Sequence, residues 1–96
     1  MNTFAVPLRI DAAHPALPGH FPGHPVVPGV VLLRAVADAL RQWCGLRLCR
    51  FDAKFLAPLL PDQDARIDLQ QDGDRVRFTI RRDETVLARG TLGDAP

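Results

Sequence analysis

Residues 28–45 read PGVVLLRAVADALRQWCG, and this stretch decides the fold. No proline or glycine interrupts the run from Val30 to Cys44, whereas Pro28 and Gly29 precede it and Gly45 follows it. Proline near the start and glycine just past the end are typical of an α-helix, here of about four turns. The first turn is apolar on every side, which predicts a helix buried in the middle of the domain.

The chain after this helix has the pattern of β-strands. Val76, Phe78 and Ile80 alternate with polar residues, which predicts a strand with those three side chains facing inward. The pair Asp72-Gly73 is typical of a tight hairpin turn. We expect four strands in this part of the chain, over residues 46–55, 64–71, 74–81 and 85–92.

The chain before the helix predicts one more strand and a loop. Residues 4–10 alternate, and Pro7 favours an edge strand because proline has no backbone donor for a sheet ladder. Prolines recur every three or four residues in 11–29, which predicts a stiff irregular loop. The expected fold is therefore α+β, with one helix wrapped by a curled antiparallel sheet of about five strands.

Size and charge limit the class of protein. The 96 residues allow one domain, which we place at 1–96, and so small a domain often shares a pocket with a second subunit. A net charge of +1 does not indicate nucleic acid as a partner. We expect no membrane span, no secretory signal and a cytoplasmic location with Cys44 and Cys49 reduced.

Two motifs carry a resemblance to a known family. Residues 20–33, HFPGHPVVPGVVLL, resemble the active-site loop and helix start of the FabA/FabZ-type β-hydroxyacyl-acyl-carrier-protein dehydratases. Residues 53–61, AKFLAPLLP, are similar to the Lys-Phe-x-x-Pro-x-x-Pro strand of that family. The short N-terminus most resembles the small dehydratase-like proteins of aryl polyene and related lipid clusters.

The resemblance implies a hotdog fold, paired into a homodimer or heterodimer with sites at the interface. It implies loss of water from a 3-hydroxyacyl thioester on acyl carrier protein or coenzyme A, with no metal or organic cofactor. His20 matches the catalytic histidine, and an imidazole can serve as base near neutral pH. Gly29 matches the glycine whose backbone N–H meets the thioester carbonyl.

The position of the family's acid, fourteen residues after the histidine, is occupied by Arg34. Arginine stays protonated and cannot act as a practical general acid. Asp38 lies one turn further along the same helix face. Three alternatives remain open: Asp38 is the acid, Asp38 forms a structural ion pair with Arg34, or a partner subunit supplies the acid.

The remaining candidate residues surround this loop and helix start. We expect the substrate to contact Phe21, Pro28, Val30, Arg34 and Phe55. His14, His20 and His24 lack the cysteine or carboxylate that would complete a metal site, so we predict no metal. The cations that could meet an acidic carrier protein are Arg47, Arg50, Lys54, Arg81 and Arg82.

Three functions are consistent with these residues. The leading hypothesis is a 3-hydroxyacyl-thioester dehydratase with His20 as base. A second is a non-catalytic acyl-binding or partner subunit of a heterodimeric dehydratase, which Arg34 favours. A third is a hotdog acyl thioesterase, with Asp38 activating water.

Overall fold

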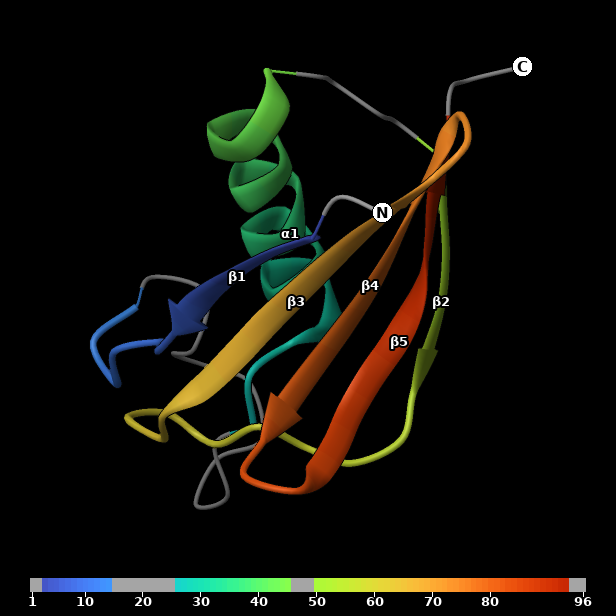
Figure 1. Cartoon of the computed structure of the whole chain (residues 1–96). Coiled ribbons are helices and arrows are strands. Elements are labelled where there is room, and N and C mark those ends of the chain that lie inside the picture. The colour runs from blue at the N-terminus through green and yellow to red at the C-terminus, as the bar shows by residue number, and fades with distance from the viewer. Residues whose placement is uncertain (1–2, 15–25, 46–49, 94–96) are drawn as a thin grey trace.

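The computed structural model describes residues 3–14, 26–45 and 50–93. One helix and five strands follow the order expected from the sequence (Figure 1). They are β1 (Thr3–Leu8), α1 (Gly29–Cys44), β2 (Arg50–Phe55), β3 (Ala65–Asp72), β4 (Arg75–Arg82) and β5 (Thr85–Gly93). The predicted strand over 46–55 is confirmed from Arg50 onward, and its first four residues lie outside the described ones.

The five strands form one antiparallel sheet in the order β1-β3-β4-β5-β2. The two edge strands are β1, as Pro7 predicts, and β2. The sheet curls around α1 on one side without closing, as Figure 1 shows. This confirms the predicted α+β fold with one helix and a curled antiparallel sheet.

Alternation along the strands builds the core. Val76, Phe78 and Ile80 are buried as expected, and Phe78 and Ile80 pair with the buried Leu69 and Ile67 of β3. The stripe of α1 that meets them holds Leu32, Val36, Ala39 and Leu40, each at most 4% exposed. The helix ends at Gly45, whose N–H donates to the Arg41 carbonyl at 2.9 Å.

The expectation of a helix buried in the middle of the domain is confirmed for one side of α1 and is wrong for the other side. Val30 is 74% exposed, and Arg34, Asp38 and Arg41 lie on the same outward side of the helix. The physical reason is that an open five-stranded sheet encloses a helix from one side only. Among the described residues, no helix has the length and apolarity that a membrane crossing requires.

The outer strand β2 lies unusually close to β5 at one point. A Cβ atom added to Gly90 would lie 1.9 Å from the backbone oxygen of Asp52, so no other residue fits there without moving the backbone. Gly90 pairs with Ala53 in the register of the two strands. This close approach therefore sets the position of the edge strand that carries Phe55.

Replacement of this glycine tests the packing of β2 on β5. We expect Gly90→Ala to lower the free energy of unfolding by at least about 2 kcal/mol, because the backbone of β2 has to shift. Urea unfolding followed by circular dichroism measures the loss.

The matched control is Gly93→Ala on the same strand, where an added Cβ meets nothing within 4 Å. This control should change the unfolding free energy by no more than about 0.5 kcal/mol. Equal effects of the two substitutions would contradict the close approach.

Candidate active site

An apolar groove of about 730 Å³ opens between the start of α1 and the end of β2. Its lining comes from residues 26–30, Leu32, Leu33 and residues 55–59. Every one of these residues is apolar, so the described part of the groove holds no ionisable side chain. The groove is therefore suited to an alkyl chain, and its described lining supplies polar groups from the backbone alone.

Backbone hydrogen bonds hold the two walls of the groove together. The Val27 N–H donates to the Leu59 carbonyl at 2.9 Å, which ties the segment before α1 to the loop after β2. The Leu56 N–H donates to the Leu87 carbonyl at 2.8 Å, which fixes where this loop leaves the sheet. Leu59 itself is fully buried beneath the groove.

Gly29 is the first residue of α1 and lies against the Phe55 ring. A Cβ atom added to Gly29 would come within 2.8 Å of the ring carbon Cζ. Among the described residues the positive-φ glycines are Gly45 and Gly73, so the backbone angle does not explain the glycine at position 29. The close approach of the Phe55 ring does explain it.

The start of α1 presents unpaired backbone donors. Pro28 caps the helix without a side-chain hydrogen bond, and the N–H groups of Val31 and Leu32 donate to its carbonyl at 3.0 and 3.4 Å. The N–H groups of Gly29 and Val30 have no hydrogen-bond partner among the described residues. Such free donors carry partial positive charge, and the first turn has no acidic residue to neutralise it.

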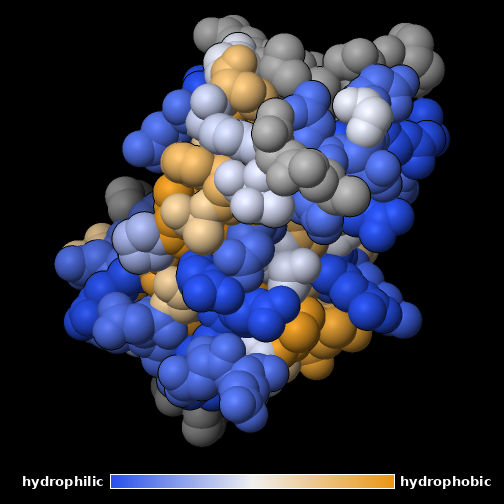
Figure 2. Space-filling view, in the orientation of Figure 1, coloured by the Kyte–Doolittle hydropathy of each residue, from blue (hydrophilic) through white to orange (hydrophobic). Residues whose placement is uncertain are grey.

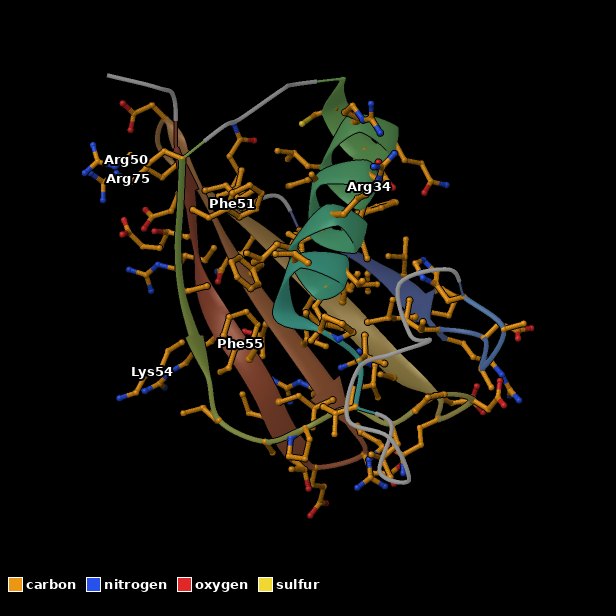
Figure 3. The ribbon with its side chains drawn as sticks, turned by 180° about the vertical axis from the view of Figure 1, so that it is seen from behind. Arg34, Arg50, Phe51, Lys54, Phe55 and Arg75 are labelled. Atoms are coloured by element: carbon orange, nitrogen blue, oxygen red, sulfur yellow. The ribbon has the colours of Figure 1, made fainter. Side chains whose placement is uncertain are left out.

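The rim of the groove is exposed and apolar. Val30 is 74% exposed, Phe55 48% and Leu56 47%. Phe51 and Phe55 project from β2 toward the α1 side, whereas Arg50 and Lys54 project the other way (Figure 3). Adjoining exposed apolar side chains of this size mark an interaction site.

The structure brings together four of the residues predicted for the site. Pro28, Gly29, Val30 and Phe55 all line the groove. Arg34 and Asp38 lie further along α1 and do not line it. His20 and Phe21 lie outside the described residues.

Asp38 forms an ion pair with Arg41, not with Arg34 as one alternative proposed. Both partners are about half exposed, so the pair lies on the surface of the helix. Arg34 is exposed (Figure 3) and has no ion pair with any described residue. The charge of Arg34 is therefore available to a group from outside the described part of the chain.

The loop at 56–59 supplies a wall of the groove that the sequence analysis did not assign. Its signal is the apolar run Phe55-Leu56 at the end of a strand, with Pro58 two residues further on. Among the described residues no three histidine, cysteine, aspartate or glutamate side chains gather as a metal site would require.

Comparison with known proteins identifies relatives of this chain. A family model described as "ApeI-like: ApeI dehydratase" matches residues 1–91. The chain is 37% identical over 88 residues to the 3-hydroxyacyl-acyl-carrier-protein dehydratase FabZ of Pelotomaculum thermopropionicum. It is 32% identical over 101 residues to the FabZ dehydratase of Granulibacter bethesdensis. These alignments cover 91% and 88% of this chain but 59% of each relative, so the chain spans about three fifths of their length.

Solved structures share the fold. The dehydratase heterocomplex ApeI:P from Xenorhabdus doucetiae matches with a TM-score of 0.84 and 21% identity, over 95% of this chain and 85% of that one. A 1,4-dihydroxy-2-naphthoyl-CoA thioesterase from Synechocystis matches with a TM-score of 0.67 and 18% identity, over 99% of this chain and 89% of that one. At these identities the likeness shows the fold alone, and the predicted hotdog fold is confirmed.

Proposed function

The chain belongs to the ApeI-like dehydratase family, and from this premise we propose that it acts in the dehydration of 3-hydroxyacyl thioesters. The acyl chain would lie in the apolar groove, with its thioester carbonyl at the start of α1. The observation that carries this proposal is that the groove meets the N–H groups of Gly29 and Val30, which have no hydrogen-bond partner among the described residues.

Dehydration needs a donor for the thioester carbonyl oxygen, because negative charge develops there as the neighbouring carbon loses its proton. The Gly29 N–H stands at the positive end of the helix dipole and beside the groove. A donor placed in this way is worth about 3–4 kcal/mol in comparable oxyanion holes. The close approach of the Phe55 ring to Gly29 supports the proposal, because this ring also lines the groove and so places the donor beside the apolar lining.

We assign the base to His20 from its place in the motif at 20–33. His20 takes the proton from the carbon next to the carbonyl. The electron pair left behind forms the carbon–carbon double bond, and the hydroxyl on the next carbon leaves. An acid protonates that hydroxyl, so that one water and one enoyl thioester are the products.

We infer that the acid comes from a second hotdog subunit. No carboxylate lines the described part of the groove, and Asp38 is held by Arg41 outside it. The exposed apolar rim and the outer edge of β2 offer a surface for such a subunit. The heteromeric assembly of the ApeI:P complex, a protein of the same fold, is consistent with this inference.

The same observations favour a second function, that of a non-catalytic partner subunit that binds the acyl chain while another chain of a heterodimer supplies both the base and the acid. Thioester hydrolysis is less well supported. It needs a carboxylate to activate water, and the described lining of the groove contains none.

Turnover of a 3-hydroxyacyl thioester of acyl carrier protein, followed by the mass of the enoyl product, tests the assignment. His20→Ala should lower kcat/KM of the assembled enzyme by about 10²- to 10⁴-fold, because it removes the base. Asp38→Asn should leave the rate nearly unchanged. Arg34→Glu should raise the rate of this chain alone, since it restores a carboxylate at the family's acid position.

Two results of this turnover assay would contradict parts of the proposed function. An unchanged rate in His20→Ala contradicts the dehydratase assignment. Loss of turnover in Asp38→Asn places the acid on this chain and contradicts its supply by a partner. Folding is not a confounding factor for Asp38→Asn, because an exposed ion pair contributes no more than about 1 kcal/mol to stability.

A separate experiment tests whether a second subunit binds at the exposed rim of the groove. We expect Val30→Asp to abolish assembly, because it places a charge in an apolar contact, and to leave the fold intact because Val30 is 74% exposed. Sedimentation velocity should then give the mass of one chain, 10.6 kDa. Gln42→Asp, also exposed on α1, is the control and should assemble like the wild type. Assembly that survives Val30→Asp would place the interface elsewhere.

A further inference from the structure

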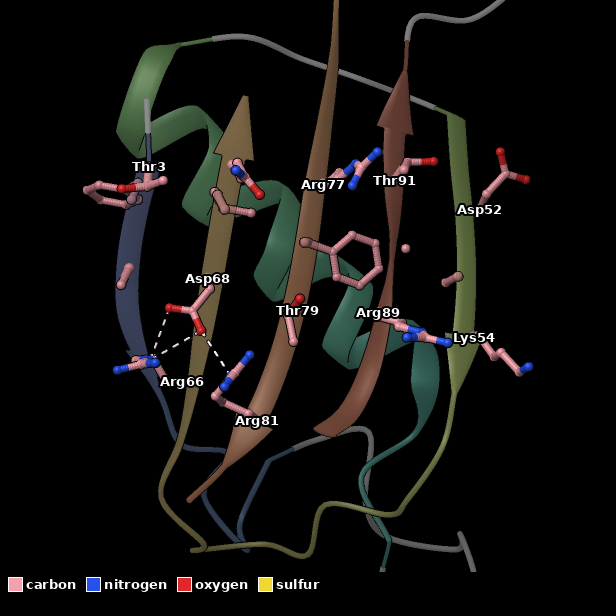
Figure 4. Close-up of a pocket in the computed structure, with 17 residues that line it drawn as sticks. Thr3, Asp52, Lys54, Arg66, Asp68, Arg77, Thr79, Arg81, Arg89 and Thr91 are labelled. Carbon is pink, nitrogen blue, oxygen red and sulfur yellow. Dashed lines mark hydrogen bonds and ion pairs between the residues drawn. The ribbon is translucent and has the colours of Figure 1, made fainter. Parts of the chain in front are cut away.

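The face of the sheet turned away from α1 carries a hollow of about 990 Å³. Hydrophilic residues cover most of the surface seen in Figure 2, and Figure 4 shows the side chains around the hollow. The acidic side chains of Asp52 and Asp68 line it together with five basic ones, so the hollow is cationic. The basic side chains are Lys54, Arg66, Arg77, Arg81 and Arg89.

Ion pairs within the chain neutralise three of these five cations. Asp68 holds Arg66 at 3.0 Å and Arg81 at 3.3 Å, as the dashed lines in Figure 4 show. Asp72 holds Arg77 at 3.2 Å. The charges that are left over lie on β2 and on its neighbour β5.

Asp52 and Lys54 are the two charges of the hollow that lie on the edge strand β2. Neither has an ion pair with any described residue. Figure 4 shows both at the edge of the sheet, where they are two residues apart and so share the outer face. Lys54 also lies directly opposite Arg89 of β5, and like charges in such positions destabilise a sheet. Lys54 therefore lacks a carboxylate beside it, and Asp52 lacks a cation.

The outer edge of β2 is open to a further strand. All six residues of β2 pair with β5 in one continuous register, and no described strand lies on the other side of β2. Proline and bulges are the usual means by which an edge strand is kept from pairing, and β2 has neither. The opposite edge strand β1, in contrast, carries Pro7.

The residues of β2 are complementary to a second copy of the same strand. Directly opposite residues of an antiparallel pair share a face, which limits the registers that a two-fold axis allows. With the axis at Ala53, Asp52 lies opposite the partner's Lys54, and Phe51 lies opposite the partner's Phe55. Opposite charges and aromatic pairs in these positions stabilise the pairing of two strands.

The other symmetric registers are less favourable. An axis at Asp52 or at Lys54 would place that charge opposite its own copy. An axis at Phe51 or at Phe55 pairs no more than half of the strand and leaves Lys54 without a carboxylate opposite it. The axis at Ala53 is therefore the register that satisfies both free charges.

We propose that Asp52 and Lys54 select a second copy of this chain as the partner of β2, in the antiparallel register centred on Ala53. The inference rests on the proposed function for the place of a second subunit at the edge of β2, and it names that subunit. A strand that carried only lysine would repel its own copy, whereas the alternation of Asp52 with Lys54 makes β2 attract it. The partner's Asp52 would also offset the repulsion between Lys54 and Arg89.

Sedimentation equilibrium of the complete chain measures the dissociation constant of the pair. Asp52→Lys and Lys54→Asp each place two like-charged pairs at the interface, so each should weaken self-association at least about tenfold. The loss should shrink as salt screens the charges. The double variant Asp52→Lys/Lys54→Asp restores opposite charges and should associate nearly as tightly as the wild type.

A mixture of the two single variants gives a result that loss of folding cannot give. Every charge of Asp52→Lys then faces its opposite on Lys54→Asp, so the two variants should bind each other more tightly than either binds itself. Circular dichroism verifies that each variant is folded.

The matched control is Glu84→Lys, which changes the net charge as Asp52→Lys does. Glu84 is exposed in the turn between β4 and β5, outside the edge strand. This variant should associate like the wild type. An equal loss in the control, or no loss in either single variant on β2, would overturn the proposal. A loss in Asp52→Lys without a loss in Lys54→Asp would place the axis at Phe51 and overturn the register.

Oxidative cross-linking tests the register directly. In the background Cys44→Ser/Cys49→Ser, mild oxidation should link Ala53→Cys to its own copy, because the two thiols lie opposite each other at the axis. Asp52→Cys should not be linked, since its thiol faces the partner's Lys54. Linkage of Asp52→Cys in place of Ala53→Cys would contradict the register.

Failure of this inference differs from failure of the proposed function. A wild type that sediments at 10.6 kDa at every concentration overturns pairing with a second copy, and the turnover assay still decides the dehydratase assignment. A pair that follows the charge rules but turns over no thioester contradicts the proposed function alone.

Discussion

Burial of one stripe of α1 against the inner face of the sheet is the interaction on which the rest of the structure depends. Leu32, Val36 and Leu40 fill that contact and leave the opposite side of the helix in solvent. Most of the backbone of α1 lies over β1 and β3, and beside β2 the inner face of the sheet carries Phe51 and Phe55. The apolar groove lies beside the first turn of the helix, where α1 no longer covers the inner face of the sheet.

The composition of the groove decides how chemistry can occur in it. An entirely apolar lining can hold an acyl chain, but it cannot move a proton. Backbone N–H groups at the start of α1 supply the one polar feature of the described lining, which is why we propose His20 as the base and another chain as the source of the acid. The edge strand β2 lies between the apolar groove and the cationic hollow, because Phe55 faces the groove and Lys54 faces the hollow.

Much of the fold was predictable from the sequence, because the apolar residues of each local pattern are the ones that are buried in the structure. The alternation around Phe78 sets the inward face of β4, and the run from Val30 to Cys44 without proline or glycine sets the helix. The exposure of Val30 was not predictable from its apolar neighbours, since it depends on how far the open sheet extends. The ion pair between Asp38 and Arg41 depends on side-chain geometry, and the position of Arg89 opposite Lys54 depends on the register of β2 and β5. No single stretch of sequence encodes either of them.

The central claim is that an acyl thioester binds in the groove with its carbonyl at the Gly29 N–H. Titration of the ¹⁵N-labelled chain with a saturated acyl pantetheine, monitored through backbone amide chemical shifts, tests it most directly. The account predicts that the Gly29 and Val30 amides move most and that the Gly29 proton shifts downfield as it gains a hydrogen bond. Shifts confined to the outer face of the sheet, with the Gly29 amide unmoved, would contradict it.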